Sequence, residues 1–267
     1  MSVELNTNPL AAPIFIGGLM KSGTTLLRKI LENHPSIFSG LETHWFSDAF
    51  QDIAHYREHQ RHQWVRDFYE LSDETVATLI AQSRSGADYL NQLMQFATRR
   101  AGKQRWLEKS PDNVFHIKSI LESWPEAKIL ITRRNLLDVF ASWKKNKKSG
   151  IEHFIVVAAE FQAQLQHYAE ERSVQVVGYE ELVRETRAVL DRVLTFIGES
   201  FVEGLHEFRG DERDYHQILK VTGKRSSTAA SIRRPIFDDS IGQWKKLLDS
   251  NEVDAICSHF GESLKSE

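Results

Sequence analysis

The chain has little cysteine and no long apolar run. Of its 267 residues only one is a cysteine, Cys257, which excludes an internal disulfide and a cysteine-rich zinc site. No stretch approaches the ~18 consecutive apolar residues of a membrane span, and residues 1–12 lack the basic start and apolar core of a signal peptide. We therefore expect a cytoplasmic protein in a reducing compartment, without a membrane partner.

An excess of charge of either sign is also missing. The formal net charge is −3 at pH 7, which argues against a nucleic-acid partner, although local basic clusters can still hold a small polyanion. The sequence contains no internal repeat, low-complexity tract or linker rich in proline and glycine. Residues 1–267 are therefore expected to form one α/β domain in which residues 1–12 are flexible, and a homodimer is left open.

The stretch that begins at Ile14 is the most informative one that the chain does contain. Ile14 to Ile16 predict a short buried strand, a glycine-rich turn follows, and apolar residues recur at helical spacing from Leu26 onwards. A strand, a loop and a helix in this order aim backbone N–H groups and the positive end of the helix dipole at one point. This pattern predicts a site for a phosphate-sized anion, with a purely structural turn as the alternative.

The loop differs from the pattern of nucleoside-triphosphate enzymes. Gly18 and Gly23 have the glycine spacing of that pattern and Thr24 follows, but Lys21 stands two residues before the second glycine instead of directly after it. Such enzymes also carry an acidic Mg²⁺ ligand at the end of an apolar strand, whereas the strand expected at 128–132 runs into two arginines. A small-molecule kinase is therefore the second choice, and no metal is expected.

A possible base follows the second strand. This strand is expected at 37–38, after a first helix that should end near Pro35. In a right-handed βαβ unit it runs parallel to the first strand, so Glu42 and His44 should lie beside the loop. A glutamate close to an anion suits the removal of a proton from an acceptor, yet histidine is the commoner base at neutral pH. The two side chains point the same way, so their spacing does not choose between them.

Residues 45–105 are helical in pattern and rich in histidine, arginine and aromatic side chains, which predicts a helical insertion or lid over the site. Within it His55, His59 and His62 would share one face of a helix, which makes a metal site geometrically feasible. No acidic or cysteine partner is evident, and an exposed polar face explains the same spacing. The interpretation without a metal is favoured.

Basic residues also stand at the ends of two later strands. Lys109 closes a short strand, with an ordinary surface lysine as the alternative. Arg134 follows the strand at 128–132, and the hydroxyl of Ser142 comes eight residues later on a helix. A guanidinium and a hydroxyl in this arrangement can bracket a second phosphate group. Pairing of the arginine with Asp138 explains the same pattern without a ligand.

The last third of the chain continues the alternation of strands and helices. A strand at 174–178 delivers Tyr179 to its exit, and a helix is predicted over 181–197. The segment 220–244 is basic, includes Arg233, and has no clear periodicity. It predicts a mobile loop that closes on the anionic donor, and a merely flexible basic loop is the alternative.

Together these stretches resemble the sulfotransferases that use 3′-phosphoadenosine 5′-phosphosulfate. Residues 20–28 are similar to that family's loop for the 5′-phosphosulfate, and the segment from Arg134 to Ser142 has its arginine-to-serine spacing for the 3′-phosphate. Residues 106–111 and 179–183 resemble further shared stretches, as do the residues around Arg233 and Trp244, so the likeness spans most of the chain. It implies a three-layer, P-loop-like α/β fold around a central, mostly parallel sheet.

The resemblance also implies roles for particular residues. The donor would be 3′-phosphoadenosine 5′-phosphosulfate, and adenosine 3′,5′-bisphosphate would be the product left behind. The implied donor-binding residues are Lys21, Ser22, Gly23, Thr24, Thr25, Arg134, Ser142, Tyr179 and Arg233. Lys21 and Lys109 would act in catalysis at the transferring sulfuryl group, and Glu42 would be the base.

Within the family, the residues from His34 to Thr43 look most like the tyrosylprotein sulfotransferase branch and its bacterial relatives. His44 stands where the tyrosylprotein enzymes carry arginine, and their membrane anchor is missing, so a tyrosine acceptor is not carried over. The replacement implies that His44 is a substrate-binding residue, which shapes the acceptor pocket or contacts the donor. The usual Asp-Pro after the 3′-phosphate arginine is Asn135-Leu136 here, which makes the local turn uncertain.

The predicted function is sulfuryl transfer to a hydroxyl, with an amine as second choice, on a small-molecule, glycan or peptide acceptor. The remaining alternatives are the phosphate-loop kinase and a nucleotide-binding module without catalytic activity. Neither alternative explains a glutamate beside the loop together with the displaced lysine.

Overall fold

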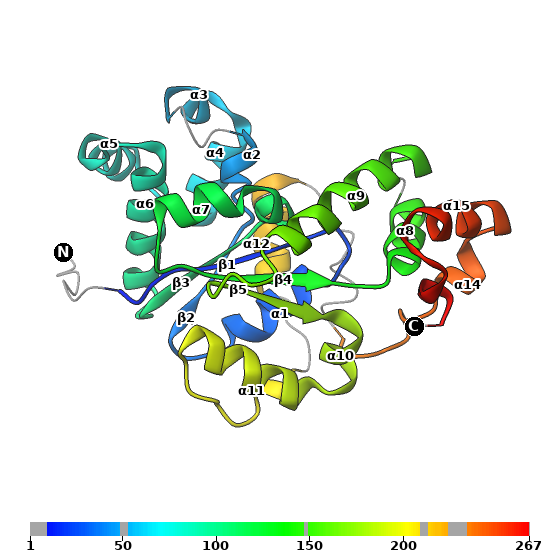
Figure 1. The fold of residues 1–267 in the computed structure, drawn as a ribbon. Coiled ribbons are helices and arrows are strands. Elements are labelled where there is room, and N and C mark those ends of the chain that lie inside the picture. The colour runs from blue at the N-terminus through cyan, green and yellow to red at the C-terminus, as the bar shows by residue number, and fades with distance from the viewer. Residues whose placement is uncertain (1–9, 49–52, 147–148, 209–212, 224–233, 267) are drawn as a thin grey trace.

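The computed structural model describes residues 10–48, 53–146, 149–208, 213–223 and 234–266 (Figure 1). Within these ranges five parallel strands form one sheet, in the order β2-β3-β1-β4-β5. The strands are β1 (Ile14–Gly18), β2 (Ile37–Phe38), β3 (Arg105–Lys109), β4 (Lys128–Arg133) and β5 (Val174–Gly178). The prediction of an α/β fold around a mostly parallel sheet is confirmed, and the described sheet is parallel throughout.

The strands carry apolar side chains on both faces, as expected for a parallel sheet that is covered on two sides. Successive side chains of a strand point to opposite faces. Phe15 accordingly packs with Trp106 in one core, whereas its neighbours Ile14 and Ile16 pack with Leu107 in the other. The alternation along β1 and β3 therefore builds two hydrophobic cores.

Helices cover both faces, which confirms the three layers (Figure 1). The core of one face is completed by α1 (Thr24–Glu32), α10 (Tyr179–Arg184) and α11 (Thr186–Ile197). The core of the other face includes α6 (Gly86–Arg100), α7 (Ile117–Ser123), α8 (Leu136–Lys145), α9 (Ile151–His167) and α15 (Ser250–Phe260). Helix α1 ends two residues before His34-Pro35, where the sequence predicts its end.

The helical insertion between β2 and β3 is present. It comprises α2 (Trp45–Asp48), α3 (Ile53–Glu58), α4 (Gln60–Phe68), α5 (Asp73–Gln82) and α6. Two of these helices begin at serine caps. The hydroxyl of Ser72 accepts a hydrogen bond from the N–H of Thr75, and that of Ser85 accepts one from the N–H of Asp88. The insertion therefore consists of short, separately capped helices.

The three histidines of the insertion do not share one helix face, which corrects that part of the sequence analysis. Helix α3 ends at Glu58, and His59 caps the next helix by accepting a hydrogen bond from the N–H of Arg61. His62 is buried and hydrogen-bonded to the hydroxyl of Tyr89 at 2.8 Å. Within the described ranges, no group of three or more His, Cys, Asp or Glu side chains is arranged to hold a metal ion.

The helix predicted over 181–197 is two helices. The backbone leaves the helical region at Glu185, with φ −124° and ψ 42°, so α10 ends at Arg184 and α11 begins at Thr186. The other described elements are η1 (Pro111–His116), η2 (Leu205–Glu207), α12 (Arg213–Thr222), α14 (Trp244–Leu247) and η3 (Glu262–Lys265). Of the helices in the described ranges, none combines the length and the apolar character needed to cross a bilayer.

Candidate active site

The predicted site residues that the structure describes lie at the carboxyl ends of the five strands. In parallel sheets this edge is where ligands bind. β1 leads into the loop of residues 19–23, β2 leads toward Glu42, β3 ends on Lys109, β4 is followed by Arg134 and β5 by Tyr179. Arg233 lies outside the described residues. The others form two neighbouring groups, a pocket around the loop and a polar cluster beside it.

The loop after β1 is closed by Ser22. Its hydroxyl donates to the carbonyl of Leu19 at 2.7 Å and is hydrogen-bonded to the hydroxyl of Thr132 at 2.6 Å, and its N–H also bonds to Leu19. Ser22 is buried and does not line the pocket. Its side chain therefore holds the loop against β4, and the structure gives no support to the prediction that it contacts the donor directly.

Two residues of the loop have left-handed backbone conformations, Lys21 with φ 78° and Gly23 with φ 101°. A side chain at Gly23 would also collide with another part of the site, because an added Cβ atom would lie 2.5 Å from Cδ2 of Tyr179. The tyrosine ring thus packs directly on the loop, which needs glycine at this position. Helix α1 starts at the next residue, so its N-terminal N–H groups face the same region.

A cavity of about 360 Å³ opens beside the loop. Seven of the nine predicted donor-binding residues line it, namely Lys21, Gly23, Thr24, Thr25, Arg134, Ser142 and Tyr179. Lys145 and Asn146 line it as well. The lysine-rich end of α8 reads in the sequence as a solvated helix terminus, so these two residues were missed. In the sequence, their place at the pocket is indicated only by their spacing of three and four residues from Ser142, which puts them on the same face of the helix.

The guanidinium of Arg134 is held at the pocket from several sides. Its Nη1 donates to the carbonyl of Lys21 at 3.1 Å, its Nη2 donates to the carbonyl of Ser240, and its Cζ lies 4.5 Å from the centre of the Tyr179 ring. Its Nε is buried without a hydrogen-bond partner among the described residues. The chain itself thus fixes the orientation of the guanidinium, and its positive charge on the pocket wall suits an anionic ligand.

Asp138 does not neutralise Arg134 by close pairing. Its nearest oxygen is 4.0 Å from Nη2 of Arg134, and both carboxylate oxygens accept backbone hydrogen bonds, from Gly242 at 2.7 Å and from Trp244 at 3.0 Å. Residues 234–244, hereafter the strap, are thereby tied to α8. Of the segment predicted as a mobile loop, residues 220–222 are helical and the strap is anchored at the pocket.

The turn after Arg134 is well formed without the family's Asp-Pro. The side-chain oxygen of Asn135 caps α8 by accepting from the N–H groups of Leu137 at 2.9 Å and Asp138 at 3.4 Å. Its amide nitrogen donates to the carbonyl of Leu264 at 2.8 Å. Asn135 therefore replaces the usual turn by a side-chain cap and connects it to the end of the chain.

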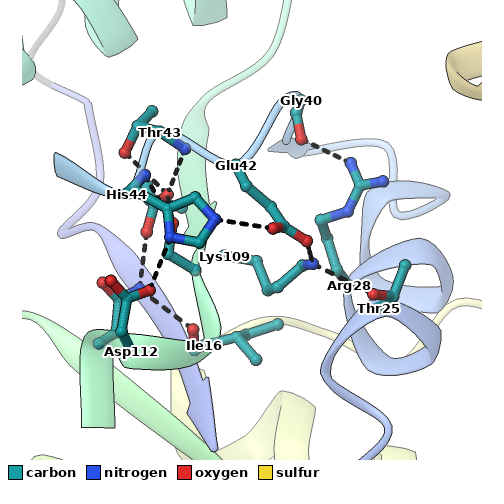
Figure 2. Close-up of polar contacts among 12 residues, drawn as sticks. Ile16, Thr25, Arg28, Gly40, Glu42, Thr43, His44, Lys109 and Asp112 are labelled. Carbon is teal, nitrogen blue, oxygen red and sulfur yellow. Dashed lines mark hydrogen bonds and ion pairs between the residues drawn. The ribbon is translucent and has the colours of Figure 1, made fainter. Parts of the chain in front are cut away.

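The polar cluster joins the loop to the second strand (Figure 2). The ammonium of Lys109 donates to the hydroxyl of Thr25 at 3.1 Å and to Oε1 of Glu42. The side chain of Lys109 is 1% exposed and that of Glu42 is 37% exposed, so the alternative of a surface lysine is wrong. Burial favours a raised pKa for Glu42, but the charge of Lys109 and the hydrogen bond from His44 outweigh it and hold the pKa well below its usual range.

His44 lies between two carboxylates (Figure 2). Its Nε2 is 3.0 Å from Oε2 of Glu42, and its Nδ1 is 3.1 Å from Oδ1 of Asp112. Burial alone would lower its pKa, but the hydrogen bonds and negative charges of these two partners raise the pKa of His44 to about 9. The ring is therefore protonated at neutral pH. An imidazolium has no lone pair with which to accept a proton.

Glu108 fixes the segment that carries these residues, and the sequence analysis assigned it no role. It is buried, and its Oε1 accepts from the N–H and hydroxyl of Thr43 at 3.0 and 2.9 Å and from the hydroxyl of Ser110 at 2.7 Å. Asn113 donates to its Oε2 at 2.6 Å. No local pattern in the sequence identifies it, because three of the five residues of β3, namely Arg105, Glu108 and Lys109, are charged.

The sheet and the loop after β1 place the chain in the class of phosphate-loop-like α/β folds. A family model described as a sulfotransferase family matches residues 13–203. This is more than half of the chain, so the chain belongs to the sulfotransferase family. An uncharacterized protein of Aquifex aeolicus (strain VF5) is 22% identical over 254 residues, which are 90% of this chain, and the chain spans 31% of that protein's length.

Solved structures share this fold. The chain is similar to the sulfotransferase domain of the Synechococcus PCC 7002 olefin synthase, with a TM-score of 0.64 and 19% identity over 97% of this chain and 98% of that one. It is also similar to the sulfotransferase domain from the curacin biosynthetic pathway, with a TM-score of 0.61 and 20% identity over 95% of this chain and 98% of that one. At such identities the likeness shows the fold alone.

Proposed function

We propose that the protein transfers a sulfuryl group from 3′-phosphoadenosine 5′-phosphosulfate to the hydroxyl of an acceptor, with an amine as the less favoured alternative. One observation carries this proposal: a single pocket lined by the loop and by Arg134 and Ser142 adjoins a buried ammonium that touches both the loop and a glutamate. Two anion-suited places in one pocket fit a nucleoside with two phosphate groups. The adjoining pair of Lys109 and Glu42 fits a transfer of the sulfuryl group to an acceptor that must lose a proton.

The donor has chemically suitable partners along the pocket. Lys21, the N–H groups at the start of α1 and Lys109 are suited to the 5′-phosphosulfate, while Arg134 and Ser142 are suited to the 3′-phosphate. The positive charge of Arg134 on the pocket wall supports this assignment. No metal is proposed as part of the site. The donor when bound supplies the activated sulfuryl group.

In this proposal Glu42 is the base. Its carboxylate stays ionised near neutral pH because of Lys109 and His44, so it can accept the proton of the acceptor as the new sulfur–oxygen bond forms and the bond from sulfur to the 5′-phosphate breaks. Lys109 and Lys21 would stabilise the charge on the sulfuryl oxygens and the leaving phosphate. His44 is disfavoured as the base because both ring nitrogens face carboxylates.

A thermal-shift measurement tests the donor assignment. Adenosine 3′,5′-bisphosphate at ~100 times its Kd should raise the melting temperature by about 5 °C or more, because it binds only the folded state. ATP with Mg²⁺ should not match this shift, since the loop lacks the lysine position and the acidic ligand of nucleoside-triphosphate enzymes. Equal stabilisation by both nucleotides would overturn the proposed donor.

The acceptor is open to a direct screen. A mixture of small-molecule, glycan and peptide acceptors is incubated with the protein and the donor, and products are detected by mass spectrometry as the addition of one sulfuryl group. Sulfated product would exclude a nucleotide-binding module without activity. Phosphorylated product that disappears with a chelator would support the kinase instead.

A further inference from the structure

Asp112 lies at one end of a row of alternating charges, and its neighbour in the row is His44. Figure 2 shows the row from Asp112 through the imidazole to Glu42 and the ammonium of Lys109. Asp112 stands at the start of η1, three residues after Lys109, so the end of β3 supplies both ends of the row. The exit of β2 supplies the two residues in between. Two strand exits are thus joined through side-chain charges.

The backbone holds the ring in this place. His44 has a left-handed conformation with φ 46°, which is unusual for histidine, and its N–H donates to the hydroxyl of Ser110 at 2.9 Å. Ser110 in turn donates to the buried Glu108. Both His44 and Asp112 keep part of their side chains exposed, 23% and 26%. The ring is therefore fixed between two carboxylates at a site that acceptor and solvent can reach.

We propose that Asp112 is a positioning residue for the base: its carboxylate, with Oδ1 3.1 Å from Nδ1 of His44, keeps the ring positively charged, so that Nε2–H anchors one oxygen of Glu42 as a charged donor. This inference rests on the proposed function, in which Lys109 turns toward the sulfuryl group. Glu42 would then lose its contact with the ammonium, and His44 would remain to hold the carboxylate in place. Asp112 would not touch acceptor or donor.

The charged groups around His44 define what a change at Asp112 should do. Glu42 and Asp112 contact the ring directly, Lys109 lies on the far side of Glu42, and His116, whose pKa is lowered by burial, also feels the charge of Asp112. With asparagine at 112, the ring stays neutral over more of the pH range. A neutral ring can still donate its Nε2–H to Glu42 while Nδ1 accepts from the asparagine amide, but it carries no positive charge, so Glu42 is held by a weaker hydrogen bond.

The first test is an NMR titration of the histidine side chains in the full chain with Asp112→Asn. His44 should titrate near pH 9 in the parent, and its pKa should fall by about a unit or more in the variant, because a negative partner is lost. Glu122→Gln removes an exposed carboxylate on α7 and is the matched control, with no expected change. A His44 pKa that stays near 9 in Asp112→Asn would overturn the proposal.

The second test is kinetic. If the His44 pKa falls to about 7, kcat of Asp112→Asn at pH 8 should be about tenfold below the parent and should recover toward pH 6, as the protonated fraction of the ring does. Donor KM should not change. In a protein that already carries His44→Gln, adding Asp112→Asn should lower kcat no further. An equal loss of kcat in that background, or a loss that does not depend on pH, would mean that Asp112 has a merely structural role.

The two proposals fail in different ways. The NMR titration needs neither donor nor turnover, so it reports on Asp112 alone. The thermal shift with adenosine 3′,5′-bisphosphate reports on the donor pocket, which Asp112 does not line. A variant that binds the bisphosphate as the parent does, while its His44 pKa is unchanged, refutes the positioning role and leaves the proposed function intact.

Discussion

At the scale of single residues, Lys109 connects the loop after β1 to the proposed base. Its buried ammonium touches Thr25 of the loop on one side and Glu42 on the other. Burial lowers the pKa of Lys109 and the neighbouring Glu42 carboxylate opposes this effect. In the proposed reaction, a donor bound at the loop would compete with Glu42 for this ammonium. The pKa of the Glu42 carboxylate would then rise, so Glu42 would become a stronger base when the donor is bound.

Glu42→Gln tests the base at this scale. The amide keeps the shape but cannot take a proton, so kcat should fall by ~10²-fold or more, as expected for the loss of a positioned base. Binding of adenosine 3′,5′-bisphosphate should be retained, because Glu42 does not line the donor pocket. The measurement is steady-state kinetics with the identified acceptor, alongside a thermal shift. A variant within a few-fold of the parent in kcat would contradict the assignment and return the role to His44.

At the scale of elements, the strap and α8 form one unit around the donor pocket. Asp138 on α8 holds Gly242 and Trp244, and the hydroxyls of Tyr179 and Ser240 are hydrogen-bonded to each other. Arg134 also donates to the carbonyl of Ser240. The strap therefore forms part of the pocket wall, and donor affinity should depend on these contacts.

Asp138→Asn should weaken donor binding without slowing the chemistry. Asparagine offers one acceptor oxygen where the carboxylate offers two, so one of the strap's N–H groups loses its partner, at a cost of about 1–2 kcal/mol. This corresponds to a Kd for adenosine 3′,5′-bisphosphate that is about tenfold higher by calorimetry. Asp254→Asn, at an exposed position on α15, is the control. A large fall in kcat with unchanged donor affinity would contradict this role.

The limits of prediction from sequence also lie at the level of elements. The strand exits and the pocket residues were predictable because apolar runs, glycines and basic residues follow one another locally, as at Arg134 and Ser142. Glu108 and Asp112 were not, since their partners lie on a different strand exit and no local pattern reveals them. The break at Glu185 was missed because the apolar spacing continues across it.

At the scale of the whole molecule, β1 divides the sheet into two functional halves. On one side, the loop after β1 and the exits of β4 and β5 line the donor pocket. On the other side, the exits of β2 and β3 carry the cluster of Glu42, His44, Lys109 and Asp112. The halves are bridged by the contact between Lys109 and Thr25 and by hydrogen bonds from Arg28 to the carbonyl of Gly40 at 2.8 Å and from Asn113 to the carbonyl of Ile16 at 3.1 Å. The helical insertion lies between β2 and β3, in the second half, and shares a hydrophobic core with α8.

This division predicts that the insertion can be exchanged. Among residues 45–48 and 53–104, which the structure describes, none lines the donor pocket. Replacing the segment 45–104 by the matching segment of a relative should therefore leave the thermal shift with adenosine 3′,5′-bisphosphate within about 2 °C of the parent. The set of sulfated acceptors should change with the new segment. A folded chimera that no longer binds the bisphosphate would show that the two halves depend on each other.

The position of the insertion in the chain has a consequence for how such proteins diversify. It enters after β2 and leaves before β3, and both strands lie on the same side of β1. If the insertion contacts the acceptor, recombination, duplication or drift within this one continuous stretch would alter which acceptor is recognised, while the residues of the donor pocket stay under their own selection. A lineage would then acquire a new acceptor by changing one contiguous piece of its gene.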